Sequence, residues 1–337
     1  MEFEKIEEVF KREPLYRLKQ VKKAIFQDLI ENWDEATTLP RNLRQELSKK
    51  CPISELKAEK ILTSKDGEAI KTLFKLRDDS KIESVLMKHR DGRRTVCLSS
   101  QVGCSIGCKF CATGQQGFKR NLSAGEIIEQ VLFFARLIKK FKEKVSNIVF
   151  MGMGEPFLNY DNVLKAIKIL NDKEEFNLGA RHISISTAGI TEGIEKLAKE
   201  KLQVNLAISL HASNDELRTK LMPINKKYPI EKILAAVDEY IKKTKRRVMF
   251  EYLMIDGVND SPKLAEELAG LLKKPLYLLN LISFNPVGHS RFKSSPGWKI
   301  KKFKEILEKA GVAVTQRYRF GQEIKAACGQ LAGENNL

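Results

Sequence analysis

The most reactive stretch of the sequence is a short loop that carries three cysteines. Cys104, Cys108 and Cys111 are separated by three residues and then by two, so a curled loop would bring their thiols together. A structural site for one metal ion normally takes four protein ligands, and no fourth Cys or His lies within the loop. Three thiolates suit a 4Fe–4S cluster, because each holds one iron and the fourth iron stays open. The spacing therefore predicts an iron–sulfur centre that takes part in chemistry.

Other interpretations of this cysteine run stay open at this point. The thiols could be buried small side chains, members of a disulfide set, or ligands of a structural zinc completed by a distant residue. The loop is rich in Gly, Ser and Lys, which argues against simple burial. Gly103, Gly107 and Gly114 permit the positive-φ turns that a curled loop needs.

Three more cysteines lie outside the run. Cys51 has no neighbouring residues that suggest a ligand or a nucleophile, and we expect it to pack in the interior. Cys97 and Cys328, taken alone, also read as buried small side chains. Cys328, however, lies in a small-residue tail, Ile-Lys-Ala-Ala-Cys-Gly-Gln, after the basic run Arg317-Tyr-Arg-Phe-Gly. Positive charge near an exposed thiol favours the thiolate.

Charge and composition limit the class of protein. The chain has 337 residues, with 60 Lys and Arg against 43 Asp and Glu, a net charge of +17 and a pI near 9.5. A field of this sign attracts nucleic acid, although a generally lysine-rich surface is the alternative. The sequence offers neither a signal peptide nor an apolar run long enough to cross a bilayer. We expect a cytoplasmic protein with no membrane partner, whose cysteines serve metal binding or catalysis.

The first 95 residues predict two small regions before the main domain. Residues 1–70 read as helical, with apolar residues at helical spacing from 15 to 29 and further helices beginning at Pro40 and spanning 54–62. Basic side chains lie among these helices and indicate either an accessory RNA-binding domain or an ordinary solvated face: Lys19, Lys22, Lys23, Arg41 and Arg44. Residues 71–95 predict a β-strand linker, a meander with strands at 72–76, 82–87 and 94–99.

Residues 96–337 alternate between strand and helix, which is typical of parallel βα units. Ser123 and Glu126 form a capping box at the start of an apolar helix. Later strands are expected at 147–151, 182–186, 204–209, 248–254 and 276–283, with helices at 161–171, 191–200, 230–243, 262–273 and 298–310. With the strand before the cysteine loop, this makes six units. The predicted fold is an α/β protein with a partial (β/α)6 TIM-like barrel.

Polar clusters follow these strands directly, where barrel enzymes carry their active sites. They are Gly152-Met-Gly-Glu-Pro, Ser186-Thr-Ala-Gly, Ser209-Leu-His-Ala and Asn285-Pro. Any one of them alone reads as a helix cap or a turn. Four clusters at one rim, facing a cysteine loop at the same rim, predict a cofactor pocket.

These motifs resemble two known groups of proteins. Cys-x-x-x-Cys-x-aromatic-Cys, with Phe110 as the aromatic, is similar to the signature of the radical S-adenosylmethionine (SAM) superfamily, whose open iron binds SAM. The segment from about 83 to 330 resembles the RlmN family of 23S rRNA adenine-C2 methyltransferases. The resemblance implies that the three cysteines of the loop hold the cluster. Further residues would bind SAM: Gly154, Glu155, Ser186, Ser209, Leu210, His211 and Asn285.

The same resemblance implies a mechanism. One SAM methylates Cys328, and a radical derived from a second SAM activates that methyl group for addition to carbon 2 of adenine 2503 in 23S rRNA or adenine 37 in some tRNAs. Glu83 would remove the ring proton, and Cys97 would release the product by forming a transient disulfide with Cys328. The segment from Glu83 to Cys97 is one residue longer than in the family, so a solvent-facing glutamate is the alternative for Glu83.

The resemblance also implies partners and competing functions. The partners would be 23S rRNA before full ribosome assembly, tRNA, and an electron donor such as flavodoxin or ferredoxin, with the enzyme acting as a monomer. The nearest competitor is a Cfr-like enzyme that methylates carbon 8 and confers antibiotic resistance; Pro156 favours the C2 type. Two further alternatives are a non-catalytic basic RNA-binding protein with a structural metal and a radical SAM enzyme for a small metabolite.

Overall fold

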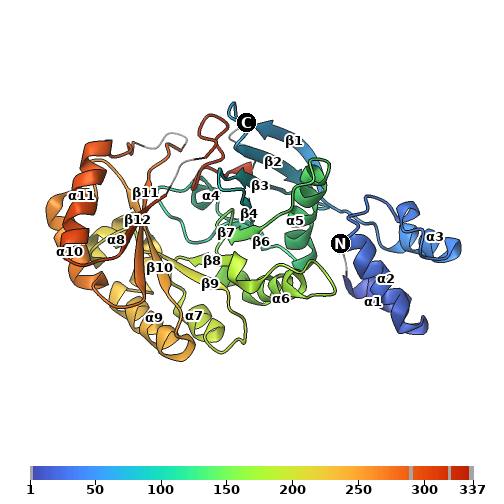
Figure 1. The fold of residues 1–337 in the computed structure, drawn as a ribbon. Helices are drawn as coiled ribbons and strands as arrows, with labels where there is room; N and C mark the ends of the chain where they lie inside the picture. Colours follow the sequence, from blue (N-terminus) through green and yellow to red (C-terminus); the bar gives the residue numbers. More distant parts are fainter. Residues whose placement is uncertain (1–2, 288–290, 318–319, 334–337) are drawn as a thin grey trace.

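One ten-stranded sheet organises the protein, and the computed structural model describes residues 3–287, 291–317 and 320–333 (Figure 1). The strand order is β1-β2-β3-β4-β7-β8-β9-β10-β11-β12. The strands are β1 Lys57–Thr63, β2 Ala69–Lys75, β3 Lys81–Lys88, β4 Arg94–Cys97, β7 Asn147–Phe150, β8 Ile183–Thr187, β9 Asn205–Ser209, β10 Val248–Met254, β11 Tyr277–Ser283 and β12 Val314–Gln316.

In this sheet the strands β4 and β7 to β12 pair in parallel with one another, and they form the open barrel that the sequence predicts. Their residues are mostly buried, because helices cover one side and loops the other; β10 and β11 are buried along almost their whole length. The predicted α/β barrel is confirmed. It has one more parallel strand than the six expected, since β12 was not predicted.

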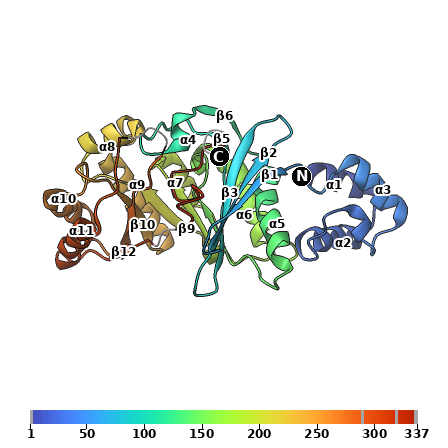
Figure 2. The same ribbon diagram turned by 90° about the horizontal axis from the view of Figure 1, so that it is seen from above.

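Helices form an arc around the outside of the parallel strands, as Figures 1 and 2 show. Most of them present an apolar stripe to the sheet; one example buries Ile233, Ala236, Val237 and Tyr240 at spacings of three and four residues. The covering helices are α5 Ala124–Lys139, α6 Tyr160–Asn171, α7 Thr191–Leu197, α8 Asp215–Leu221, α9 Ile230–Thr244, α10 Pro262–Leu272 and α11 Gly297–Lys309. None of the described helices is long and apolar enough to span a membrane.

Strands β1 to β4 form an antiparallel meander that continues into the parallel sheet through β4. The expected helix over 54–62 was wrong, because β1 occupies Lys57–Thr63. Its sequence, KAEKILT, contains helix-forming residues, but β1 pairs with β2 along most of its length and stays largely exposed at the sheet edge. Pairing with a neighbouring strand has overridden the local propensity.

The N-terminal helices lie at one end of the molecule, beyond the meander (Figure 2). They are α1 Phe3–Val9, α2 Leu15–Phe26 and α3 Arg41–Lys50, so the helical region ends well before residue 70. Cys51 is 1% exposed and packs in the interior, as expected. Several of the basic residues pair with acids of this chain: Lys19 with Glu174 at 3.8 Å, Lys22 with Glu175 at 2.7 Å and Lys23 with Asp28 at 2.6 Å.

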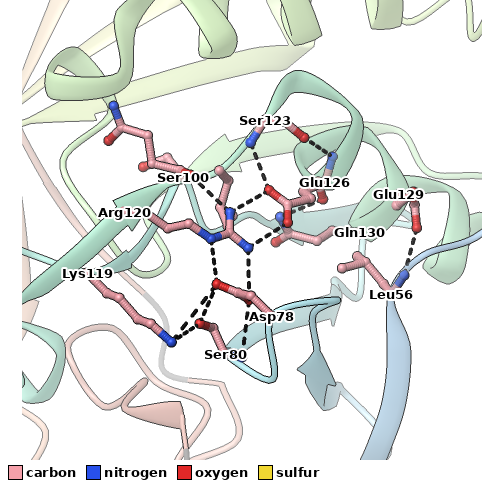
Figure 3. A network of polar contacts seen from close by, with 12 residues as sticks. Leu56, Asp78, Ser80, Ser100, Lys119, Arg120, Ser123, Glu126, Glu129 and Gln130 are labelled. Carbon is pink, nitrogen blue, oxygen red and sulfur yellow. Dashed lines mark hydrogen bonds and ion pairs between the residues drawn. The ribbon is translucent and has the colours of Figure 1, made fainter. Parts of the chain in front are cut away.

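A small second sheet carries the three-cysteine loop. Strands β5 Gln101–Gly103 and β6 Phe118–Asn121 are antiparallel, and the loop between them includes the short helix α4 Ala112–Gln115. Figure 3 shows how an arginine on β6, Arg120, ties this sheet to its surroundings. Its guanidinium contacts Asp78 in the meander at 2.9 Å and Glu126 at the start of α5 at 2.8 Å. Glu126 also completes the predicted capping box with Ser123.

Candidate active site

The polar clusters and the three-cysteine loop meet at one central cavity. About 930 Å³ of space is free of atoms there, the open solvent at its mouth included. The cavity lies at the carboxyl ends of the parallel strands, as the sequence predicts. The predicted residues that line it are Cys104, Cys108, Phe110, Cys111, Gly154, Glu155, Ser186, Ser209, His211 and Cys328.

Backbone contacts shape the cysteine loop. The amide of Cys104 donates to the carbonyl of Gly117 at 2.7 Å, and the amide of Cys111 donates to the carbonyl of Cys108 at 3.2 Å. Gly103 and Gly107 have positive φ, as expected. Gly114 differs: it lies in α4, and a Cβ atom there would be 2.9 Å from the amide nitrogen of Cys108, so close packing rather than backbone turning requires glycine.

The three thiols fit an iron–sulfur cluster chemically. All three line the same cavity, and burial raises the pKa of Cys104 to about 12 and that of Cys108 well above its ordinary value. Thiolates there would need a compensating cation, and bound iron supplies that charge. Among the described residues, no three His, Cys, Asp or Glu side chains are grouped for a single metal ion.

Glu155 joins the loops that follow β7 and β8. It is 4% exposed, and its two carboxylate oxygens accept the amides of Ala188 at 2.7 Å and Phe157 at 3.0 Å. Burial raises the pKa of its carboxyl. Gly154 before it has φ +101, and a Cβ atom would lie 2.5 Å from the side chain of Gln101. The Gly-Glu pair therefore allows a tight backbone approach beside the cavity.

An acidic side chain that the sequence reasoning missed, Glu251 on β10, lines the cavity among the predicted serines. Ser186 donates to Glu251 Oε2 at 2.6 Å, and Ser209 Oγ lies 3.4 Å from Ser186 Oγ. Glu251 Oε1 is buried without a hydrogen-bond partner, and Arg317 lies 3.5 Å from it. An acceptor of this kind in a cavity wall suits a polar ligand such as SAM.

His211 faces Phe110 across the cavity wall, with the two rings edge to face and 4.8 Å between their centroids. Its Nδ1 accepts the amide of Leu253 at 3.1 Å, which leaves the proton on Nε2. Burial lowers the pKa of His211 to about 3, so the ring stays neutral at physiological pH. Leu210 beside it is fully buried and does not line the cavity; its amide donates to the carbonyl of Glu251 at 3.0 Å.

A buried arginine that the sequence reasoning also missed holds two of these loops. Arg218 on α8 is 0% exposed, and its guanidinium donates to the carbonyls of Ala188 at 2.6 Å, Ser209 at 3.1 Å and Leu210 at 3.1 Å. Because one planar group binds carbonyls after both β8 and β9, it fixes the two polar loops relative to each other. An arginine on an amphipathic helix gave no sequence signal for this role.

The two distal cysteines share a side pocket that adjoins the central cavity. Cys97, Cys328, Asn285 and Arg317 line this pocket, and Cys328 lines the central cavity as well. Desolvation inside the two pockets raises the pKa of Cys97 to about 12 and that of Cys328 to about 11, although part of Cys328 is exposed, while the positive charge of Arg317 opposes both shifts. Tyr318 and Arg319 of the basic run lie outside the described residues. All six cysteines are free.

Asn285 and Glu83, like Leu210 and Cys97, do not line the central cavity. Asn285 is 3% exposed, and its amide contacts the tail, donating to the carbonyl of Cys328 at 3.4 Å. Glu83 lines neither pocket and is 0% exposed, so the alternative of a solvent-facing glutamate is wrong. Its carboxylate forms an ion pair with Lys71 at 2.8 Å.

Comparison with known proteins agrees with this geometry. The sequence model of the Radical SAM superfamily matches residues 98–269, about half of the chain. A crystal structure described as a radical SAM methyltransferase from Sphaerobacter thermophilus superposes with a TM-score of 0.96 at 45% identity, covering 99% of this chain and 98% of that one. The fold and the site therefore define a radical SAM enzyme.

The relatives narrow the class further. Proteins from Dictyoglomus thermophilum and Thermoanaerobacter sp., both named probable dual-specificity RNA methyltransferase RlmN, are 47% and 46% identical to this chain. The matches cover 95% and 98% of this chain and 91% and 96% of the relatives. The chain belongs to the RlmN family of radical SAM RNA methyltransferases.

Proposed function

We propose that this enzyme methylates carbon 2 of adenine 2503 in 23S rRNA and, in keeping with the dual specificity in its relatives' names, adenine 37 in some tRNAs. The observation that carries the proposal is the position of Cys328. Its thiol lines the central cavity with Cys104, Cys108 and Cys111, and it also lines the side pocket with Cys97. The sulfur of Cys328 can thus receive a methyl group in the central cavity and be attacked by the thiol of Cys97 in the side pocket, which would release the product.

The proposed cofactors are a 4Fe–4S cluster on the three loop cysteines and SAM in the cavity beside Gly154, Glu155, Ser186, Ser209 and His211. When bound, they supply a methyl group and a 5′-deoxyadenosyl radical. The chain's own residues position the reactants and exclude water. Phe110 and His211 close one wall of the cavity, while Glu155 and Arg218 hold the loops that would surround SAM.

The roles proposed for the distal residues follow from the need to release the product. The Cys328 thiolate would take the methyl group of one SAM, with S-adenosylhomocysteine as the leaving group, and would carry it as a thioether. After its carbon has bonded to the adenine ring, Glu83 takes the ring proton and the Cys97 thiolate attacks the Cys328 sulfur. A disulfide between the two cysteines then remains, which an external thiol must reduce.

The proposed partners follow from the substrate and the charge. Adenine must leave its stack to enter a cavity at a barrel rim, which favours 23S rRNA before ribosome assembly is complete and the unpaired bases of tRNA loops. The net charge of +17 would attract either RNA. The N-terminal helices would add RNA contacts. A flavodoxin- or ferredoxin-type donor would supply the electron to a cytoplasmic monomer.

Product analysis tests the proposal. The purified protein, with its cluster, is incubated with unmodified 23S rRNA, SAM and a reductant, and the digested RNA is compared with standards of 2-methyladenosine and 8-methyladenosine. We expect 2-methyladenosine, absent from the reaction of the C328A variant. 8-Methyladenosine would show the regiochemistry of the resistance-type enzyme and overturn the proposal.

A further inference from the structure

An ion pair is buried in the meander, away from both pockets. Lys71 on β2 and Glu83 on β3 are 1% and 0% exposed, and their charged groups are 2.8 Å apart. Removing two charges from water is costly, and the attraction between them repays that cost only when further polar groups satisfy both. The groups that form hydrogen bonds with Lys71 and Glu83 therefore indicate the role of this ion pair.

The remaining partners are backbone groups of the C-terminal tail, residues 320–333. Lys71 Nζ donates to the carbonyl of Lys325 at 3.3 Å. Glu83 Oε2 accepts the amides of Ala332 at 2.7 Å and Gly333 at 3.2 Å. The pair thus holds the tail at two points, three residues before Cys328 and four residues after it.

Strand register explains why this pair meets the tail beside Cys97. Lys71 is opposite Val85, and Val85 is opposite Cys97, so these three side chains form one row across β2, β3 and β4. Glu83 lies two residues from Val85 on the same strand and therefore on the same face. One face of the meander carries the ion pair and the thiol proposed to release the product.

The cysteine loop holds the opposite side of the tail. The amide of Ala112 donates to the carbonyl of Gly329 at 2.8 Å, and the hydroxyl of Thr113 donates to that of Leu331 at 2.6 Å. The tail is therefore held between the meander and the loop, and Cys328 lies in the stretch between these contacts. In Figure 1 the red segment after β12 returns across the molecule toward the blue strands of the meander.

We propose that Lys71 is a positioning residue, which with Glu83 forms a latch that holds the tail and places Cys328 between the two pockets. The closed latch also keeps Glu83 from the substrate, because its carboxylate is fully covered and engaged by Lys71 and the tail amides. The tail must release Glu83 before that carboxylate can take a proton. The inference rests on the proposed function only for the roles of Cys328 and Glu83; the hold on the tail can be tested without RNA.

Limited proteolysis tests the latch directly. Trypsin cleaves after Lys325, at the peptide bond whose carbonyl Lys71 binds, and Lys325 itself is exposed. The initial rate of release of residues 326–337 from the full-length protein with its cluster is measured by mass spectrometry. We expect release at least tenfold faster in K71M than in wild type. Equal rates would overturn the proposal.

Three further variants make the result specific. K75M removes a lysine of the same strand that pairs with Asp79 at the surface, and we expect the wild-type release rate. K71R keeps the positive charge, and we expect it to restore most of the protection. A332P removes a tail amide that Glu83 accepts and leaves Lys71 and the meander strands unchanged, so it should accelerate cleavage even if K71M does not fold. Unchanged cleavage in A332P, or equal acceleration in K75M, would contradict the latch.

Hydrogen exchange tests the release of Glu83. The amides of Ala332 and Gly333 should be protected in the free enzyme and exchange at least tenfold faster when RNA is covalently trapped on Cys328 in the C97S variant. Equal protection in both states would show that the latch stays closed during the reaction. If the wild-type protein did not methylate RNA but K71M still released residues 326–337 faster than wild type, the result would count against the proposed function and not against the latch.

Discussion

At the scale of single residues, Cys97 and Cys328 share one pocket with Arg317, and under the proposed function this arrangement sets the fate of the RNA-bound intermediate. Without Cys97, the side pocket as described holds no second thiol to attack the Cys328 sulfur. We therefore expect C97S to accumulate a covalent protein–RNA adduct and to release less than about one hundredth of the product. Denaturing gel electrophoresis with labelled RNA measures both.

The matched control for this experiment is C51A, which removes the thiol of a buried cysteine and keeps the backbone carbonyl that accepts the indole of Trp33 at 2.6 Å. This variant should release product at the wild-type rate and form no adduct. Clean release of product by C97S would refute the resolving role of Cys97.

Sequence reasoning at this scale found side chains that carry recognisable motifs and missed those that act through buried contacts. The loop cysteines, Glu155 and His211 follow strands or repeat a known spacing, and they line the cavity together. Arg218 and Glu251 carry no such sequence signal, because their importance comes from the carbonyls and hydroxyls that they contact in the folded protein. Such contacts depend on packing between segments that are distant in the sequence, and the spacing of residues along the chain does not reveal them.

At the scale of secondary-structure elements, the ion pair between Asp78 and Arg120 joins the meander to the sheet that carries the cysteine loop (Figure 3). Hydrogen bonds from Arg120 hold the pKa of Asp78 below its ordinary value near 3.8. The carboxylate therefore stabilises the fold above that pH, and the stabilisation is lost as the pH falls below it. We expect D78N to cost about 1 kcal/mol at pH 7, since both side chains are partly exposed.

The measurement is the urea midpoint of wild type and D78N at pH 7 and at pH 3. The difference between the two proteins should be present at pH 7 and reduced at pH 3. D79N, which changes the neighbouring exposed residue, should leave the midpoint at pH 7 unchanged. A D78N difference that grows on acidification would contradict the assigned charge state.

Element boundaries in the parallel region could be predicted to within a few residues, because buried strands alternate with amphipathic helices there. Prediction failed at the edges of the sheet. Strand β1 has a helix-forming sequence and exists because β2 offers it a partner, while β12 has only three residues, too few for a periodic pattern. Edge strands depend on their neighbours more than on their own sequence.

At the scale of the whole molecule, the net charge of +17 predicts RNA binding that depends strongly on salt. Affinity for a 23S rRNA fragment should fall at least about tenfold between roughly 50 and 200 mM KCl, because bound cations are released from the phosphates. Filter binding over this range gives the slope of log affinity against log salt. A slope near zero would contradict electrostatic attraction as the source of affinity.

A double variant tests which lysines contribute to that field. Lys22 on α2 pairs with the mostly buried Glu175 at 2.7 Å, and Lys19 lies 3.8 Å from the exposed Glu174, so each lysine already has an acidic partner within this chain. We expect K19M/K22M to keep the wild-type salt slope. A slope lower by about two would show that both lysines contact phosphates.

The placement of Cys328 between the cysteine loop and Cys97 matters only if its sulfur carries the transferred carbon. Mass analysis of the peptide that contains Cys328, from active protein made in iron-replete cells and purified without oxygen, tests this most directly. The account predicts one extra methyl group on that sulfur. An unmodified Cys328 in protein that methylates rRNA would contradict it.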